Sequence, residues 1–492
     1  MRASLSFVGL VAVATSVVAQ KVVPLSFSRA SSEHQSLRKR AGTYSQELNN
    51  NLTGGGYYAE VALGTPPQPV TLILDTGSSD VWVLDTNADL CQSRSLQSIY
   101  GTCLATYEPT DSSTYTVVDQ DAFRIQYLDG SGAEGDYIKD TLHIAGTSVE
   151  ALQVGLAENS SINSGLLGIG FNTNVAADKP YPNIADLFVE QDLISIQAYS
   201  LYLDDLNAET GTILFGGIDT KKFIGQLKSV DILPDAQSNT YSSFTVALGS
   251  LKVNSSSSNS NGSELITKET PVILDSGTTL TYLPSSIARR IYQTFNAVDD
   301  TRDTGLVYVS CDLLSSEKDT TIDFQFGDRN GPVVRVPIDE LVLDNVKGYL
   351  NIGLELPDLP FDDVCSFGIQ SLSGIYLLGD TFLRSAYVVY DLTNKKIGLA
   401  QANVNATESN VMEITSSGIP LVSGVAAQQT PSKSSGNHSD DANNSGTDAD
   451  QANGSTTNSA APRAMPALNW EAGAVMLVAT LFSIAGAGLF AL

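Results

Sequence analysis

The chain has 492 residues, of which 42% are hydrophobic, so it is long enough for two or three domains with sizeable cores. Its 54 Asp and Glu residues outnumber its 27 Lys and Arg residues, which gives a formal net charge of −27 at pH 7. This charge argues against nucleic acid as a partner, because nucleic acids bind basic surfaces, and it is compatible with basic substrates.

The first forty residues consist of two segments that indicate secretion. Residues 1–19 combine an early Arg, an apolar centre and small residues ending at Ala19, which is typical of a secretory signal peptide. Residues 20–40 end in Lys39-Arg40, which predicts a site for a processing protease and therefore a removable pro-segment. A membrane anchor and an incidental charged turn are the respective alternatives.

Secretion decides how the four cysteines are interpreted. In an oxidising compartment an even number of cysteines predicts disulfides, and four cysteines allow three pairings. Local order along the chain favours Cys91–Cys103 and Cys311–Cys365. The chain has only three histidines and its cysteines lack the CxxC spacing, so we expect no metal and no cofactor.

Residues 51–402 have the pattern of an all-β protein, in which short β-prone runs alternate with Gly, Pro, Asp and Asn turns. The clearest strand-like runs are 56–64, 70–75, 212–218, 241–253 and 385–400. Only two segments predict helices, residues 183–193 and residues 285–298, the second with Ser285 as a possible N-cap. A polar run at 253–264 interrupts a strand pattern and predicts a mobile surface loop.

The composition changes after residue 402. Residues 405–463 are rich in Ser, Thr, Asn, Asp and Ala, which is typical of a glycosylated stalk that cannot order itself. Residues 472–492 are apolar and uncharged, and a spacer separates them from the small residues 458–460. This order predicts a glycolipid-anchor (GPI) signal with attachment at Asn458, or otherwise at Asn453 or Gly454, and a single membrane-spanning helix is the alternative.

Eight Asn-x-Ser/Thr sequons predict N-glycosylation wherever they are exposed. They are Asn51, Asn159, Asn254, Asn261, Asn405, Asn437, Asn443 and Asn453.

Two stretches, "ILDTGSSDVW" at 73–82 and "ILDSGTTLTY" at 273–282, repeat one pattern 200 positions apart. Each is followed by a second shared motif, "GLLGIG" at 165–170 and "YLLGDT" at 376–381. The common order of motifs predicts an internal duplication whose copies pack about a pseudo-twofold axis. Such an axis would bring Asp75 and Asp275 face to face.

This pairing explains the residues around each Asp. Two buried carboxyl groups in contact cannot both ionise cheaply, so they share a proton and can activate a water without a metal or a covalent nucleophile. The glycines of the two motifs allow close backbone approach, and the hydroxyl residues can donate to the carboxylates or tie the two loops together. The residues are Gly77, Gly277, Ser78, Thr278, Thr76 and Ser276.

On these motifs the sequence resembles pepsin-like aspartic proteases, and within them the yapsin-type fungal enzymes that a glycolipid anchors at the cell surface. The resemblance covers residues 51–402. It implies an all-β, bilobal fold with two pseudo-twofold-related lobes, residues 41–205 and 206–403, and an active-site cleft between them. A stalk at 404–458 and a removed anchor signal at 459–492 complete the expected organisation.

The resemblance also implies roles for further residues. Residues 123–137 match the hairpin flap that closes over bound peptide, with Tyr127 as the flap tyrosine and Trp82 as its hydrogen-bond partner. Asp129 stands where an Asp accompanies acceptance of Lys or Arg before the cut in several fungal relatives. The positions that usually contact substrate backbone correspond to Gly77, Gly277 and Thr279.

We therefore expect a monomeric, secreted aspartic endopeptidase that is GPI-anchored at the plasma membrane or cell wall. It would cut peptides at acidic pH, with a preference for Lys or Arg. Three alternatives remain: a catalytically silent wall glycoprotein, a serine hydrolase that depends on His143, and a glycosidase that uses two carboxylates. The pro-segment is short for the family, so the resemblance does not establish that it inhibits the enzyme.

Overall fold

A computed structural model describes residues 20–29, 56–208, 210–255, 264–266, 268–347 and 356–426. All of them belong to one of two compact units, and the second unit, residues 427–474, lies outside the described residues. Also outside lie the predicted signal peptide and anchor signal, Lys39-Arg40, most of the 253–264 loop, and the sites at Asn51, Asn261, Asn437, Asn443, Asn453 and Asn458.

The first half of the chain forms most of a 13-stranded sheet. Buried and less buried side chains alternate along its strands, as they do when one face of a sheet packs against the core. The sheet order is β12-β25-β24-β9-β10-β1-β2-β3-β8-β4-β7-β6-β5. Its strands are β1 (Val23–Arg29), β2 (Tyr57–Leu63), β3 (Gln68–Asp75), β4 (Val81–Leu84), β5 (Thr116–Gln126), β6 (Gly132–Ile144), β7 (Thr147–Ser160), β8 (Gly165–Gly168), β9 (Ala198–Tyr202), β10 (Thr210–Phe215), β12 (Phe223–Asp231), β24 (Ala386–Asp391) and β25 (Lys396–Ala402).

The second half supplies a seven-stranded sheet and a four-stranded sheet. The seven-stranded sheet has the order β19-β18-β13-β14-β23-β15-β22 and the four-stranded sheet the order β16-β17-β21-β20. Their strands are β13 (Thr245–Asn254), β14 (Thr270–Leu274), β15 (Thr281–Pro284), β16 (Val298–Asp300), β17 (Leu306–Ser310), β18 (Thr321–Phe326), β19 (Val333–Pro337), β20 (Val342–Leu343), β21 (Val364–Phe367), β22 (Ile369–Leu372) and β23 (Leu377–Leu378). The expected all-β architecture is therefore confirmed.

Helices are short in the described part of the chain, and none of them is long and apolar enough to cross a membrane. They are α1 (Asp89–Gln92), α2 (Arg94–Tyr100), α3 (Ile184–Glu190), α4 (Ser285–Phe295), α5 (Leu313–Ser316) and α7 (Asp380–Leu383), with 3₁₀ turns η1 (Pro109–Asp111), η2 (Asn172–Asn174) and η3 (Ile338–Glu340). The prediction that Ser285 is the N-cap of α4 is wrong, because Pro284 occupies the N-cap position and Ser285 is the first helical residue. Helix α3 instead has a full capping box, made by Asn183 and Asp186.

The two halves repeat one local topology around the Asp motifs. Strand β3 ends at Asp75 and pairs in parallel with β8, and β8 pairs antiparallel with β4, which follows the motif. Strand β14 ends at Leu274 and pairs in parallel with β23, and β23 pairs antiparallel with β15. The "GLLG" and "YLLG" segments therefore contain the strands that pair beside the two Asp loops, which explains why both motifs are duplicated.

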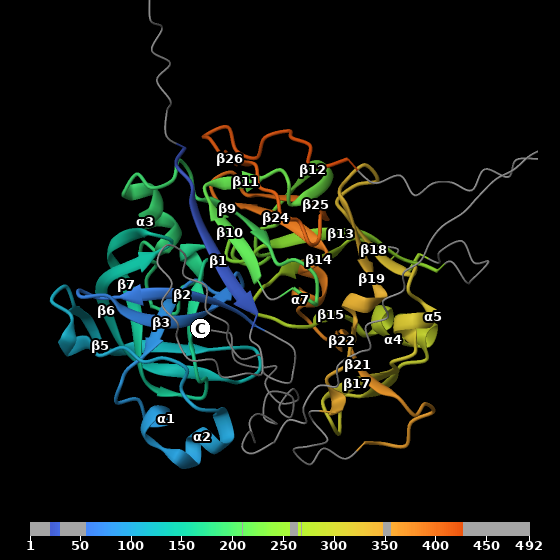
Figure 1. Cartoon of the computed structure of the whole chain (residues 1–492), viewed down its shortest axis with the longest axis horizontal. Coiled ribbons are helices and arrows are strands. Elements are labelled where there is room, and N and C mark those ends of the chain that lie inside the picture. The colour runs from blue at the N-terminus through green and yellow to red at the C-terminus, as the bar shows by residue number, and fades with distance from the viewer. Residues whose placement is uncertain are drawn as a thin grey trace, which may run out of the picture. The chain divides into compact units, whose positions relative to one another are not determined.

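Part of the predicted pro-segment is a buried strand. Strand β1 pairs with β10 over six residues and with β2 over three, and it lies between them in Figure 1. Its side chains alternate, with Val23, Leu25 and Phe27 buried and Pro24 and Ser26 exposed. Gly211 on β10 has no room for a side chain, because the Phe27 ring covers it. The segment is therefore integrated into the sheet.

The predicted stalk begins too early at residue 404. The two-stranded sheet pairs β11 (Gly217–Asp219) with β26 (Val411–Glu413), so residues beyond 404 belong to the folded body. Ile414 is fully buried, and Val425 bridges to Ile224. The polar composition of this region hid a few well-spaced apolar residues, whose burial orders the chain to at least residue 426.

Candidate functional site

The two Asp loops meet through Thr76 and Ser276, which hydrogen-bond each other reciprocally. The backbone N–H of Thr76 donates to Ser276 Oγ at 3.2 Å, and the N–H of Ser276 donates to Thr76 Oγ1 at 2.9 Å. Each hydroxyl also donates across the joint, Thr76 to the carbonyl of Leu274 at 3.1 Å and Ser276 to that of Leu74 at 2.9 Å. Four bonds in a buried place fix one loop against the other.

Each carboxylate is held by its own motif in the same way. Gly77 N–H donates to Asp75 Oδ1 at 2.7 Å, and the Ser78 hydroxyl donates to Asp75 Oδ2. In the second motif the N–H donates to Oδ1 at 2.9 Å and the hydroxyl to Oδ2 at 2.7 Å. The residues that repeat the pattern there are Asp275, Gly277 and Thr278.

The two carboxyl groups lie against each other at this joint. Asp75 and Asp275 are 4% and 9% exposed, and their side chains lie in contact with each other. A Cβ on Gly77 would lie 2.5 Å from Asp275 Oδ1, and a Cβ on Gly277 would clash with Asp75 Oδ1. Only glycine therefore fits at either position. The structure therefore places Asp75 and Asp275 next to each other, as the duplicated motifs predict.

Burial raises the pKa of both carboxyl groups above the ordinary value for Asp. For Asp75 the negative charge of Asp275 adds to the effect of burial, while hydrogen bonds from Ser78 and Gly77 oppose it. For Asp275 the donors Thr278 and Gly277 oppose burial. Such a pair holds one proton between its members over a range of pH, so one oxygen can accept a proton while another donates.

Strands β5 and β6 form a hairpin whose turn carries Tyr127. Trp82 Nε1 donates a hydrogen bond of 2.9 Å to the Tyr127 hydroxyl. The turn closes with bonds from Tyr127 N–H to the Ser131 carbonyl and from Gly130 N–H to the Tyr127 carbonyl, and Gly130 has a φ of 85°. Burial, and after it the negative charge of Asp75, raise the pKa of Tyr127.

Asp129 lies exposed at the tip of this hairpin. Its Oδ1 accepts hydrogen bonds from the N–H and the hydroxyl of Ser131, at 2.9 and 2.6 Å. Its charge also reaches β15 of the second half, where it adds to burial in raising the pKa of Tyr282 to about 12. The remaining predicted contact residue, Thr279, is half-buried four residues after Asp275, and its carbonyl accepts from the N–H of Thr381 at 3.0 Å.

Sequence reasoning missed two contributors around the first Asp loop. Asn174 Nδ2 donates to the Gly77 carbonyl at 3.2 Å, which ties the η2 turn to the loop. Asp80 is fully buried and accepts three hydrogen bonds. An acidic residue inside the otherwise apolar and hydroxyl-rich "ILDTGSSDVW" was the available signal for Asp80, whereas nothing in the sequence pointed to Asn174.

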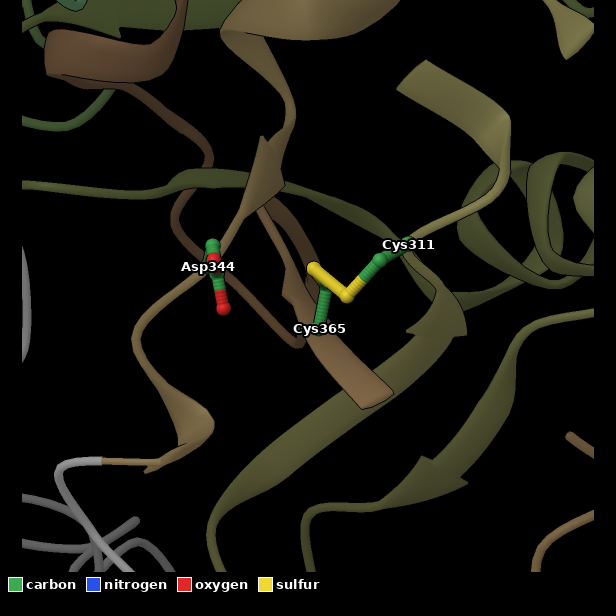
Figure 2. A group of neighbouring side chains, drawn as sticks. All are labelled: Cys311, Asp344 and Cys365. Atoms are coloured by element: carbon green, nitrogen blue, oxygen red, sulfur yellow. A yellow bond between two sulfur atoms is a disulfide. The ribbon is translucent and has the colours of Figure 1, made fainter. Parts of the chain in front are cut away.

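Both favoured disulfides form, Cys91–Cys103 and Cys311–Cys365. Asp344 lies beside the second of them, as Figure 2 shows, and these three residues form the group with metal-ligand geometry in the described part of the chain. Both sulfur atoms are bonded to each other, so they cannot act as thiolate ligands. Asp344 instead pairs with Lys347 at 3.5 Å.

His143 on β6 contacts Ser148, with 3.0 Å between Nδ1 and Oγ. Its other ring nitrogen lies 3.0 Å from the backbone carbonyl of Gly64 rather than from a carboxylate, so the third member of a serine-hydrolase triad does not contact it. The described sequons, Asn159, Asn254 and Asn405, are all exposed, and their glycosylation stays a prediction.

Comparisons with known proteins agree with this geometry. The family model described as "Eukaryotic aspartyl protease" matches residues 56–402. A "Probable aspartic-type endopeptidase opsB" of Aspergillus oryzae is 41% identical over 386 residues, which cover 77% of this chain and 74% of that protein. "Candidapepsin" of Candida tropicalis is 32% identical over 394 residues, which cover 79% and 90% of the two chains. The crystal structure of an aspartic proteinase from Irpex lacteus superposes with a TM-score of 0.55 at 20% identity, covering 73% of this chain and 97% of that one.

Proposed function

Because the chain belongs to the family of eukaryotic aspartyl proteases, we propose that Asp75 and Asp275 are the catalytic pair of this aspartic endopeptidase. One ionised carboxylate takes a proton from a water, which attacks the peptide carbonyl, and the protonated partner donates a hydrogen bond to the carbonyl oxygen. The direct contact of the two buried carboxyl groups is the observation that carries this proposal.

The residues around the pair have supporting roles in this scheme. Ser78 and Thr278 fix the outer carboxylate oxygens, so that the inner ones face each other. Gly77, Gly277 and Thr279 present backbone groups to an extended peptide, which would bind as an added strand. Thr76 and Ser276 hold the geometry rigid, as pre-organised catalysis requires.

The flap completes the site. Tyr127, held by Trp82, closes over the bound peptide and excludes bulk water from the reacting groups. The raised pKa values of both carboxyl groups favour a singly protonated pair at acidic rather than alkaline pH, so we propose that the enzyme works in acid.

We further propose a preference for Lys or Arg at the cleavage site. Asp129 is exposed at the flap tip, and its negative charge adds to burial in raising the pKa of Tyr282 on β15. A basic side chain beside the flap tip would gain from this carboxylate in a partly closed site, where the effective dielectric is lower than in water. The overall net charge of −27 favours the approach of basic peptides as well.

The proposed location is the outer face of the cell, after removal of the signal peptide and processing at Lys39-Arg40. The predicted anchor signal and the Ser/Thr/Asn-rich stalk support attachment through a glycolipid at Asn458. The protein would act as a monomer on peptide or protein substrates. Release of the activity from intact cells by a glycolipid-specific phospholipase tests the anchor separately from the catalytic proposal.

Cleavage of a peptide library at pH 4–6, by the protein and by its Asp75→Asn variant, tests the catalytic proposal. Cleavage that depends on Asp75 supports it, and equal cleavage by both proteins overturns it. The same library reads out the preference for Lys or Arg directly.

A further inference from the structure

One buried carboxylate that this catalytic scheme does not use follows Asp75 by five residues and is hydrogen-bonded to the flap hairpin. Asp80 precedes β4 and is fully buried. Its Oδ1 accepts hydrogen bonds from the hydroxyls of Tyr137, at 2.9 Å, and Tyr181, at 2.5 Å. Its Oδ2 accepts from the backbone N–H of Ala176 at 2.7 Å. All three partners are donors.

These donors come from two different parts of the first half of the chain. Tyr137 is on β6, the second strand of the flap hairpin, and packs edge-on against Phe123 of β5. Tyr181 and Ala176 belong to the loop between η2 and α3, and the rings of Tyr181 and Tyr137 contact each other with centroids 5.7 Å apart. Asp80 therefore joins the flap hairpin and this loop to the segment that carries the first Asp motif.

Both carboxylate oxygens act as acceptors in this arrangement. An ionised carboxylate can accept all three bonds, and hydrogen bonds to a charged acceptor are stronger than those between neutral groups. An amide of the same shape would have to turn its NH₂ either toward the two hydroxyls or toward the Ala176 N–H. Burial raises the pKa of Asp80, and the three hydrogen bonds counteract this effect.

We propose that Asp80 is a positioning residue for the flap. Two side-chain hydrogen bonds in the described part of the chain attach the hairpin to the 75–84 segment, Trp82 to Tyr127 near the tip and Asp80 to Tyr137 farther along β6. The bond between Asp80 and Tyr137 sets the distance between the hairpin and the catalytic pair. Tyr127 is thereby held in position to accept its hydrogen bond from Trp82. This inference goes beyond the proposed function and rests on it only for the role of Tyr127 as the flap residue.

The experiment uses Asp80→Asn in the full chain. Trp82 and Trp470 are the two tryptophans of the sequence, so a Trp470→Phe background makes the emission of Trp82 the only tryptophan signal. We expect KM for a peptide substrate to rise about tenfold, with kcat changed less than about threefold, because a displaced flap weakens substrate binding. Trp82 is fully buried in the wild-type structure, and we expect it to become more accessible to acrylamide quenching in Asp80→Asn.

Asp219→Asn is the matched control. Asp219 is also buried and also accepts three hydrogen bonds, from Lys221, Ser409 and Asn410, but it is on β11, outside the site. It should lower thermal stability and leave KM and Trp82 quenching unchanged. If Asp80→Asn lowers only stability, or if both variants change KM equally, the positioning role is refuted.

A second variant keeps the proposal testable if Asp80→Asn does not fold. Tyr137→Phe removes a single hydroxyl from the hairpin and leaves the carboxylate with two donors. We expect KM to rise about threefold and Trp82 quenching to increase, and wild-type values for both would overturn the proposal. Since quenching needs no turnover, this readout separates a failure of the flap inference from a failure of the proposed catalytic pair.

Discussion

Thr76 and Ser276, 200 residues apart, exchange backbone-to-hydroxyl hydrogen bonds with each other across the joint between the two halves. Each residue both donates its N–H and accepts at its hydroxyl, and each hydroxyl donates onward to the opposite strand. These bonds therefore place Asp75 and Asp275, the residues that precede Thr76 and Ser276, next to each other. The active-site geometry therefore depends on residues that do no chemistry.

Replacing Thr76 by Val, which keeps its shape but removes the hydroxyl, should uncouple the two loops. The Ser276 N–H loses its acceptor and the Leu274 carbonyl loses its donor in a buried place, so we expect a loss of about 1–3 kcal/mol in unfolding free energy and a marked fall in kcat. The Thr76→Val/Ser276→Ala double variant removes all four bonds and should be less stable than either single variant. Thermal unfolding and steady-state kinetics measure both effects, and wild-type stability and kcat in the single variants would contradict a structural role for these bonds.

The raised pKa values of Asp75 and Asp275, the proposed catalytic pair, make the stability of the fold depend on pH. Both carboxyl groups have a pKa raised in the folded chain, mainly by burial, above the unfolded value of about 3.9. Their contribution to stability is full below about pH 4 and is lost as the pH rises through the raised folded pKa values. The melting temperature should therefore fall between pH 4 and pH 7.

Asp75→Asn should make that fall smaller, because it removes one of the two shifted groups. Asp235→Asn is the control, since Asp235 is exposed and its hydrogen bonds lower its pKa, the opposite direction. An unchanged pH dependence in Asp75→Asn would mean that the pair does not titrate as described.

Asp129→Ala should reduce kcat/KM for a Lys or Arg peptide by about tenfold and for a matched Leu peptide by less than about twofold. The carboxylate attracts the basic side chain only, and it contributes little to the turn apart from its bonds to Ser131. Ser131→Ala, which perturbs the same turn without removing the charge, is the control. Equal losses on both peptides would exclude Asp129 from specificity.

Phe27→Ala should destabilise the unprocessed precursor by about 3–5 kcal/mol, because a fully packed ring would leave a cavity over Gly211. Ser26→Ala, on the exposed side of the same strand, should change stability by less than about 0.5 kcal/mol. Thermal unfolding of both variants, with Lys39-Arg40 replaced to prevent cleavage, gives the comparison. Equal stabilities would mean that β1 is not a structural strand.

The sequence predicts the centre of this site well because the same motif occurs once in each half of the chain. Two copies of one motif, each with its own apolar strand, determine both the pairing of Asp75 with Asp275 and the roles of the neighbouring hydroxyls. Asp80 lies in the same quoted stretch but could not be assigned, since its partners Tyr137 and Tyr181 are 57 and 101 residues away. Such partners are set by tertiary packing and leave no local pattern.

The errors at the edges of the fold have local physical causes. Pro284 occupies the N-cap position of α4, so Ser285 is the first helical residue rather than the cap. Residues 404–426 have the polar composition of a stalk, yet a single fully buried side chain, Ile414, and the pairing of β26 with β11 fix them to the body. Average composition does not show where a few apolar residues find a partner surface.

The most direct test of the account is peptide hydrolysis at acidic pH by the wild type and by Asp75→Asn and Asp275→Asn, each confirmed to be folded. Because both carboxyl groups act on one water, either substitution alone should reduce kcat by at least about a thousandfold, and the double variant should lose little more. Substantial turnover by either single variant would contradict a shared catalytic pair.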